Sequence, residues 1–141
     1  MNQSEIRDFL LTFNAAEVRK DEENKLEIFE VNFENLKKIW QEKMAGELGD
    51  FERETGNKIL AKIAESEEPK AIFAIIHDSS KPLKVEMKTG AQLARILREK
   101  ESVVPSKLMS EREWNLVIGQ GQVSAEELQD LFRLSYRLVC E

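Results

Sequence analysis

Two stretches near the middle of the chain constrain its fold most strongly. Residues 71–76 form a short apolar run, Ala-Ile-Phe-Ala-Ile-Ile, and residues 83–88 alternate between apolar and charged side chains. A turn-rich segment, residues 77–82, separates them. Because successive side chains of a strand point to opposite faces, this pattern predicts a β-hairpin with one face inward and the other face charged.

The segment after this hairpin predicts a helix followed by a break. Thr89 and Gln92 have the spacing of a capping box, in which two side chains satisfy backbone groups at a helix start. The apolar residues of the helix would be Leu93, Ile96 and Leu97. Pro105 stops any continuation, because proline disfavours helical geometry in the residue before it.

The remaining chain predicts a short strand and a final helix. Ser110 and Glu113 repeat the capping spacing but allow at most one helical turn, after which residues 114–118 are strand-like. Gly119-Gln120-Gly121 predicts a turn. Residues 124–127, Ser-Ala-Glu-Glu, form a third capping box and open a helix. Its predicted buried residues are Leu128, Leu131, Phe132, Ser135 and Val139.

Residues 1–31 predict a helix and a short strand. Ser4 is the expected N-cap of a helix with an apolar face. That face consists of Ile6, Phe9, Leu10 and Phe13. After a polar loop, residues 25–31 alternate partly and predict one strand.

From Phe33 the apolar residues recur at steps of three and four, which indicates helix. The stripe consists of Phe33, Leu36, Trp40, Met44, Leu48 and Phe51, continued by Ile59, Leu60 and Ile63. Gly46, Gly49 and Gly56 interrupt it, and a glycine in a helix interior costs about 1 kcal/mol relative to alanine. The pattern predicts two helices, or one kinked helix, ending before Pro69. Alternatively, the glycines mark turns between strands, with residues 58–64 extended.

Together these elements predict one α+β domain over residues 1–141. A helical, acidic N-terminal part covers residues 1–70, and a hairpin-helix-strand-helix part covers residues 71–141. Because sequential strands usually pair, we expect a small antiparallel sheet with helices packed on one face. The length of 141 residues fits one domain, and 41% hydrophobic residues suffice for a core.

Charge and targeting features narrow the class of protein. The net charge of −6 lies in residues 1–70, whereas residues 71–141 carry equal numbers of basic and acidic side chains. An acidic chain needs a local basic face to bind nucleic acid. No apolar run reaches the roughly 20 residues that span a bilayer, and the first residues do not read as a secretory signal. With Cys140 the only cysteine, these features predict a cytoplasmic protein without a membrane partner.

The segment from Ile72 to Val139 resembles the MmcQ/YjbR family, small bacterial domains with a fold similar to CyaY. The matching pieces are Ile72-Phe73-Ala74, Leu83 to Lys88, Gln92-Leu93-Ala94, Leu97-Arg98-Glu99-Lys100, Val104-Pro105, Met109-Ser110, Trp114-Asn115, Glu126-Glu127-Leu128, Ser135-Tyr136 and Leu138-Val139. They cover about half of the chain. The resemblance implies a bacterial α+β domain of a kind often described as DNA-binding, with no established enzymatic chemistry.

Few residues suggest catalysis or a cofactor. His77, the only histidine, would need carboxylates beside it to act as a base or a metal ligand, but the adjacent Asp78 points the other way on an extended chain. Cys140 would need a partner base to act as a nucleophile. Gly119-Gln120-Gly121 lacks the remaining glycine of a phosphate loop. We therefore expect an ordinary turn histidine, an inert cysteine, no catalytic residue, no metal and no cofactor.

The main functional candidate is a cluster of basic residues. It comprises Lys81, Lys84, Lys88, Arg95, Arg98 and Lys100. Lys84 and Lys88 would share one strand face, while Arg95 and Arg98 would lie one helical turn apart. Such a face can meet phosphates without reading sequence. The alternatives are a solvated face, or a docking surface for the acidic half of the chain.

Two further residues complete the candidate site. Lys107 follows Pro105 in a loop, and Trp114 is either a stacking platform for a base or, as we favour, a partly buried core anchor. The predicted nucleic-acid-binding set is Lys81, Lys84, Lys88, Arg95, Arg98, Lys107 and Trp114. The apolar stripe that begins at Phe33 is expected in the core, although it could instead pair two copies in a homodimer.

Two functional hypotheses follow from the sequence. The first is weak, non-specific DNA binding through the basic face, with an affinity that falls steeply with salt. The second is a protein-interaction module whose acidic helical half binds a basic partner or mimics nucleic acid. An enzyme is the weakest hypothesis, because the residues needed for acid–base, metal or phosphate chemistry do not converge.

Overall fold

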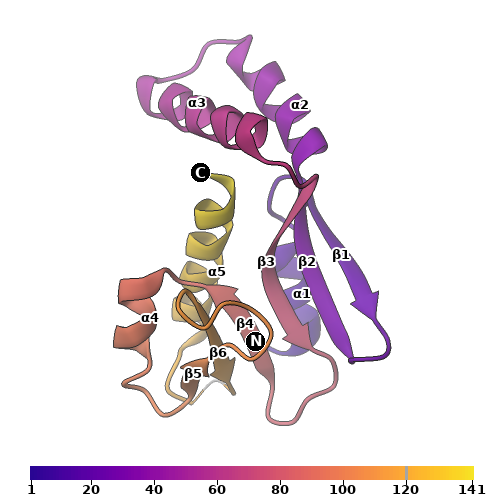
Figure 1. Ribbon diagram of the computed structural model, residues 1–141, viewed down its shortest axis with the longest axis vertical. Coiled ribbons are helices and arrows are strands. Elements are labelled where there is room, and N and C mark those ends of the chain that lie inside the picture. Colours follow the sequence, from indigo (N-terminus) through magenta and orange to yellow (C-terminus); the bar gives the residue numbers. More distant parts are fainter. Residues whose placement is uncertain (120) are drawn as a thin grey trace.

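The computed structural model describes residues 1–119 and 121–141, which form an α+β fold (Figure 1). Its helices are α1 (Gln3–Leu10), α2 (Phe33–Met44), α3 (Asp50–Glu65), α4 (Ala91–Leu97) and α5 (Ala125–Cys140). Its strands are β1 (Ala16–Asp21), β2 (Leu26–Asn32), β3 (Lys70–His77), β4 (Lys84–Lys88), β5 (Val103–Pro105) and β6 (Trp114–Ile118). None of these helices has both the length and the apolar character that crossing a membrane requires.

The strands form one antiparallel sheet in the order β1-β2-β3-β4-β6-β5. This confirms the predicted fold class and the predicted β3–β4 hairpin. Strands β1 and β5 were not predicted. They are the two edges, and in β1, which reads Ala-Glu-Val-Arg-Lys-Asp, only Ala16 and Val18 alternate as apolar residues packed against the core. Residues 1–70 therefore supply two complete strands and the first residue of β3, where the sequence predicted one strand in a mainly helical part.

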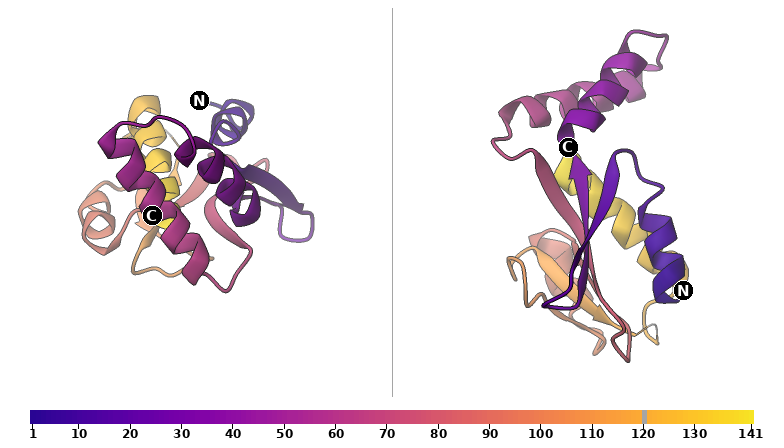
Figure 2. Two further views of the ribbon diagram at one scale, coloured as in Figure 1. Left: turned by 90° about the horizontal axis from the view of Figure 1, so that it is seen from above. Right: turned by 90° about the vertical axis from the view of Figure 1, so that its right-hand side faces the viewer.

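Helices α1 and α5 cover one face of the sheet, which we call the inner face (Figure 2). The main core lies there, between these helices and strands β2, β3 and β4. Ser124 caps α5 by accepting a hydrogen bond from the backbone N–H of Glu127. All five residues predicted for the buried side of α5 are buried, which confirms that prediction.

The start of α1 differs from the prediction. Asn2, not Ser4, is the N-cap: its side chain accepts a hydrogen bond of 2.8 Å from the backbone N–H of Glu5, and Glu5 accepts one from the backbone of Asn2. Asparagine caps helices as well as serine does. The reciprocal pair with Glu5 fixes the earlier start.

Helices α2 and α3 form a hairpin that extends beyond one end of the sheet (Figure 1). Two separate helices confirm one of the predicted arrangements, and exclude extended structure over residues 58–64. The apolar stripe holds for α2, where Phe33, Leu36 and Trp40 are buried. It fails at Phe51, which is 80% exposed, because the chain breaks between the helices and changes direction.

Two predicted turn features also differ in detail. Thr89 does not cap α4: it is buried, and the helix begins after Gly90, whose φ of +84° favours glycine. The backbone N–H groups of Thr89 and Gly90 instead donate to the carbonyl of Glu113. The predicted Gly119-Gln120-Gly121 turn lies partly outside the described residues, because Gln120 is not among them; Gly119 has a φ of +65°.

Candidate functional site

The basic strand residues lie on the outer face of the sheet, opposite α1 and α5. On this face Ile75 packs with Leu26 and Ile28 in a small apolar cluster, and Glu86 is its direct partner across the β3–β4 ladder. Side chains two positions apart on a strand share a face. Lys84 and Lys88 therefore flank Glu86 on the outer face, as the alternation predicted.

The prediction that the charged face of the hairpin is exposed to solvent is wrong at Glu86, in the middle of β4, which is 0% exposed. Its carboxylate accepts hydrogen bonds from the Ser106 hydroxyl, from the backbone N–H of Lys107 at 3.2 Å and from His77 Nε2 at 2.6 Å. Burial alone would raise the pKa of Glu86, but these hydrogen bonds outweigh it and hold that pKa below its usual 4.5. The sequence alone could not predict this network, because Ser106 lies in a loop 20 residues away from Glu86 along the chain.

His77 ends β3 and faces Glu86, not Asp78. An ionised carboxylate can only accept hydrogen bonds, so the shared proton lies on Nε2 of His77. Asp78 instead accepts from Gln3 and Ser79. Among residues 1–119 and 121–141, no three His, Cys, Asp or Glu side chains lie close enough to hold a metal ion.

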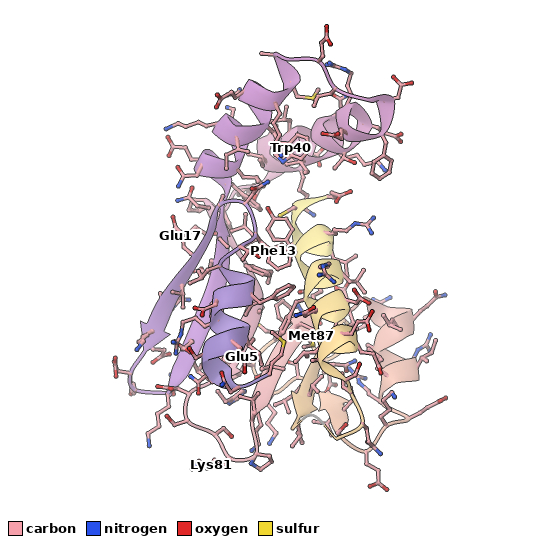
Figure 3. The ribbon with its side chains drawn as sticks, turned by 180° about the vertical axis from the view of Figure 1, so that it is seen from behind. Glu5, Phe13, Glu17, Trp40, Lys81 and Met87 are labelled. Atoms are coloured by element: carbon pink, nitrogen blue, oxygen red, sulfur yellow. The ribbon has the colours of Figure 1, made fainter. Side chains whose placement is uncertain are left out.

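The structure separates some of the predicted basic residues. Lys81 lies in the turn before β4 (Figure 3), whereas α4 follows the other end of that strand. Lys107 is exposed in the loop whose backbone Glu86 anchors. Neither residue lines the hollow described next.

Three arginines converge on one surface hollow. It has a volume of about 220 Å³ and is lined by Ala91, Arg95, Arg98 and Arg112. Arg95 and Arg98 come from α4 and the residue that follows it, and Arg112 comes from the turn before β6. We call this the arginine hollow.

Arg98 is held in place by the strand it packs against. Its Nε donates to Asn115 Oδ1 at 2.7 Å, and its Nη2 donates to the backbone carbonyls of Trp114, at 3.2 Å, and Glu111. Asn115 is fully buried and donates in turn to Thr89 Oγ1 and to the carbonyl of Ala94. The chain of contacts fixes one guanidinium at the hollow before any ligand arrives.

The charge in the hollow is not matched by neighbouring acids. Arginine is always protonated, and none of the ion pairs among the described residues involves Arg95, Arg98 or Arg112. Glu111 meets Arg98 through its backbone carbonyl, not through its carboxylate. Like charges brought together in this way create a positive potential that favours an anion.

Trp114 does not offer a ring for base stacking, because it is 4% exposed. It is the core anchor that we favoured, and its backbone carbonyl helps to orient Arg98.

Arg112, by contrast, was absent from the predicted set. Between Glu111 and Glu113, Arg112 did not stand out as part of a basic cluster. The predicted turn over Ser110 to Glu113 nevertheless indicated that it would lie near Trp114.

The fold resembles solved structures of two bacterial proteins. Deinococcus radiodurans protein DR2400, which carries a DUF419 domain, aligns over 96% of this chain and 76% of its own, with a TM-score of 0.66 and 19% identity. A protein from Pseudomonas syringae aligns over 99% of both chains, with a TM-score of 0.61 and 14% identity. At these identities the likeness shows the fold alone. DUF419 is in the MmcQ/YjbR-like superfamily.

No protein-family model matches the sequence, and no curated protein matches it.

Proposed function

We propose that the chain is a divergent MmcQ/YjbR-like domain that binds nucleic acid weakly and without sequence preference. The observation that carries this proposal is the arginine hollow, where three guanidiniums converge without a carboxylate partner. Phosphates are the groups that guanidiniums bind best in nucleic acid. Contacts to phosphate give affinity and position but no sequence information.

Two features support the assignment to this family and surface. The predicted hairpin, helix, strand and helix of residues 72–139 are present in that order, with the unpredicted β5 added, and a DUF419 protein shares the fold. Lys88 on β4 pairs with Trp114 on β6, beside the turn that carries Arg112. It extends the positive surface toward the outer face. We place the protein in the bacterial cytoplasm, where nucleic acid is accessible.

The proposal is tested by fluorescence anisotropy with a short DNA duplex over a series of salt concentrations. Binding through the arginine hollow and Lys88 neutralises about two to four phosphates, so log Kd should rise with log salt with a slope of about 2–4. Arg95→Glu/Arg112→Glu should abolish binding at moderate salt. The matched control is Lys37→Glu/Lys62→Glu, which makes the same charge change at exposed positions of α2 and α3. Equal loss in both variants would mean that net charge, not this surface, determines binding.

The strand lysines need a separate variant. If the outer face contributes, Lys84→Glu/Lys88→Glu should weaken DNA binding and lower the salt slope. Binding equal to that of the parent would show that the outer face does not contribute. Because both lysines are half-buried, the melting temperature of the variant must be measured alongside.

The second candidate is an interaction module whose acidic helices bind a basic protein. The α2–α3 hairpin gives it less support, because acids and bases alternate there in ion pairs such as Glu34–Lys38 and Glu54–Lys58. Absence of DNA binding at low salt, together with specific retention of a basic protein by the intact chain, would favour this candidate over nucleic-acid binding.

A further inference from the structure

We infer that the arginine hollow is a site for a terminal phosphate, so that the protein binds nucleic-acid ends carrying a phosphate monoester more tightly than uninterrupted backbone. This inference rests on the proposed function, because it names the part of the nucleic acid that the same site takes. Three properties of the hollow lead to it: its size, its charge and the fixed position of Arg98.

The size of the hollow suits a small anionic group. Its volume is about 220 Å³, below the roughly 300–1,000 Å³ of pockets that enclose drug-sized ligands. A water molecule in the liquid occupies about 30 Å³, so the hollow has room for a phosphate and a few waters. The small side chain of Ala91 also lines the hollow and offers no competing charge.

The number of guanidiniums matches a terminal phosphate better than an internal one. A monoester phosphate has three terminal oxygens, whereas a phosphodiester has only two that are free of ester bonds. At neutral pH the monoester also carries a charge of about −1.5 to −2, while the diester carries a single charge. Arg95, Arg98 and Arg112 can therefore each meet one oxygen of a monoester, and its greater charge relieves more of their mutual repulsion.

The fixed position of Arg98 reduces the cost of binding. Its Nε and Nη2 are held by Asn115 and by two backbone carbonyls. Of its three guanidinium nitrogens, only Nη1 has no hydrogen bond to the described residues. Arg95 and Arg112 are exposed and can close on an anion that Arg98 already positions.

The inference is tested with blunt DNA duplexes of one sequence, labelled internally, that end in hydroxyl, 5′-phosphate or 3′-phosphate groups. The parent protein should bind at least one phosphorylated duplex about tenfold more tightly than the hydroxyl duplex, the effect of one additional charge-assisted contact. Inorganic phosphate at constant ionic strength should remove this preference. Arg95→Ala and Arg112→Ala should each lower the ratio of the two affinities toward one, with a smaller effect on the hydroxyl duplex. Arg98→Lys, which keeps the charge but loses the planar fork, should do the same.

The outcomes separate this inference from the proposed function. Equal affinity for all three duplexes, still sensitive to salt and to Arg95→Glu/Arg112→Glu, overturns the terminal-phosphate site and leaves backbone binding in place. A preference for phosphorylated ends that survives the arginine substitutions overturns the assignment to this hollow. Failure to bind any duplex at low salt overturns both proposals.

Discussion

The hydroxyl of Ser135 on α5 donates a hydrogen bond of 2.6 Å to the backbone carbonyl of Phe73 on β3. The same oxygen accepts a bond of 2.9 Å from the backbone N–H of Lys88 on β4. The β3–β4 register reaches only as far as Ala74 and Met87 in this direction. A helix side chain therefore continues the pairing of the two strands one position beyond the ladder.

Replacing Ser135 with alanine should destabilise the fold strongly. Ser135 is 0% exposed, so water cannot take over both contacts, and each unsatisfied buried group costs about 1–3 kcal/mol. We expect Ser135→Ala to lower the free energy of unfolding by about 2–4 kcal/mol, measured by urea denaturation. The control, Ser4→Ala on the exposed side of α1, should change it by less than about 0.5 kcal/mol. Similar losses in the two variants would show that the bridge does not contribute.

Gly56 should not tolerate even one added methyl group. A Cβ at this position would lie 2.7 Å from Met44 Sδ and 2.8 Å from Trp40 Cε3, inside the α2–α3 contact. Alanine improves helix propensity by about 1 kcal/mol, but overpacking typically costs about 1–3 kcal/mol. Gly56→Ala should therefore lower the melting temperature. Gly46→Ala meets only an ordinary contact at 3.6 Å and should leave the melting temperature nearly unchanged; a rise in both variants would contradict the packing argument.

Cys140 should be unreactive in the native protein. It is 0% exposed, and burial raises the pKa of its thiol to about 12, against an opposing hydrogen bond with Tyr136. Since the thiolate is the reactive species, a chromogenic disulfide reagent at mildly alkaline pH should label the unfolded chain promptly and the native chain only at the rate of unfolding. Rapid labelling of the native protein would mean that the end of α5 is open to solvent.

The central strands and α5 could be predicted because burial imposes a period on their sequences. Ala71 to Ile76 and the alternation from Leu83 to Lys88 leave few other arrangements. The edge strands β1 and β5 could not be predicted in this way. No residue of β1 is fully buried, and β5 is only three residues long, so neither sequence carries a clear burial period. The role of Gly56 could not be predicted either. In the sequence a glycine at this position indicates a helix break, whereas in the structure it leaves room for the ring of Trp40.

The candidate site was predicted only in part, because its geometry depends on contacts between distant residues. Arg95 and Arg98 lie together through helical spacing, which the sequence shows. Arg112 joins them only because Arg98 bonds to the backbone of the turn before β6. In the same way Glu86 looks like a surface charge in its strand, and only Ser106 and His77 make its burial possible.

Glu86→Gln should destabilise the protein although the two side chains have the same shape. The amide loses the charge that strengthens the hydrogen bonds from Ser106 and Lys107, and its NH₂ group cannot accept the bond from His77. We expect a loss of about 1–3 kcal/mol in the free energy of unfolding. Glu30→Gln is the matched control, since its pair with the exposed Arg19 should contribute less than about 1 kcal/mol. Equal effects would mean that the buried network adds nothing beyond a surface ion pair.

The same carboxylate should make stability depend on pH below neutrality. The pKa of Glu86 is held below its usual 4.5 in the folded state, so its contribution is fully present above that value and is lost as the pH falls through the lower, folded pKa. The parent should therefore lose more stability than Glu86→Gln as the pH falls below about 4.5. The variant keeps some acid sensitivity, because the pKa of Glu27, which accepts hydrogen bonds from Arg7 and Gln3, is also lowered despite burial. Urea denaturation across this pH range measures the difference, and parallel curves for the two proteins would contradict the assignment to Glu86.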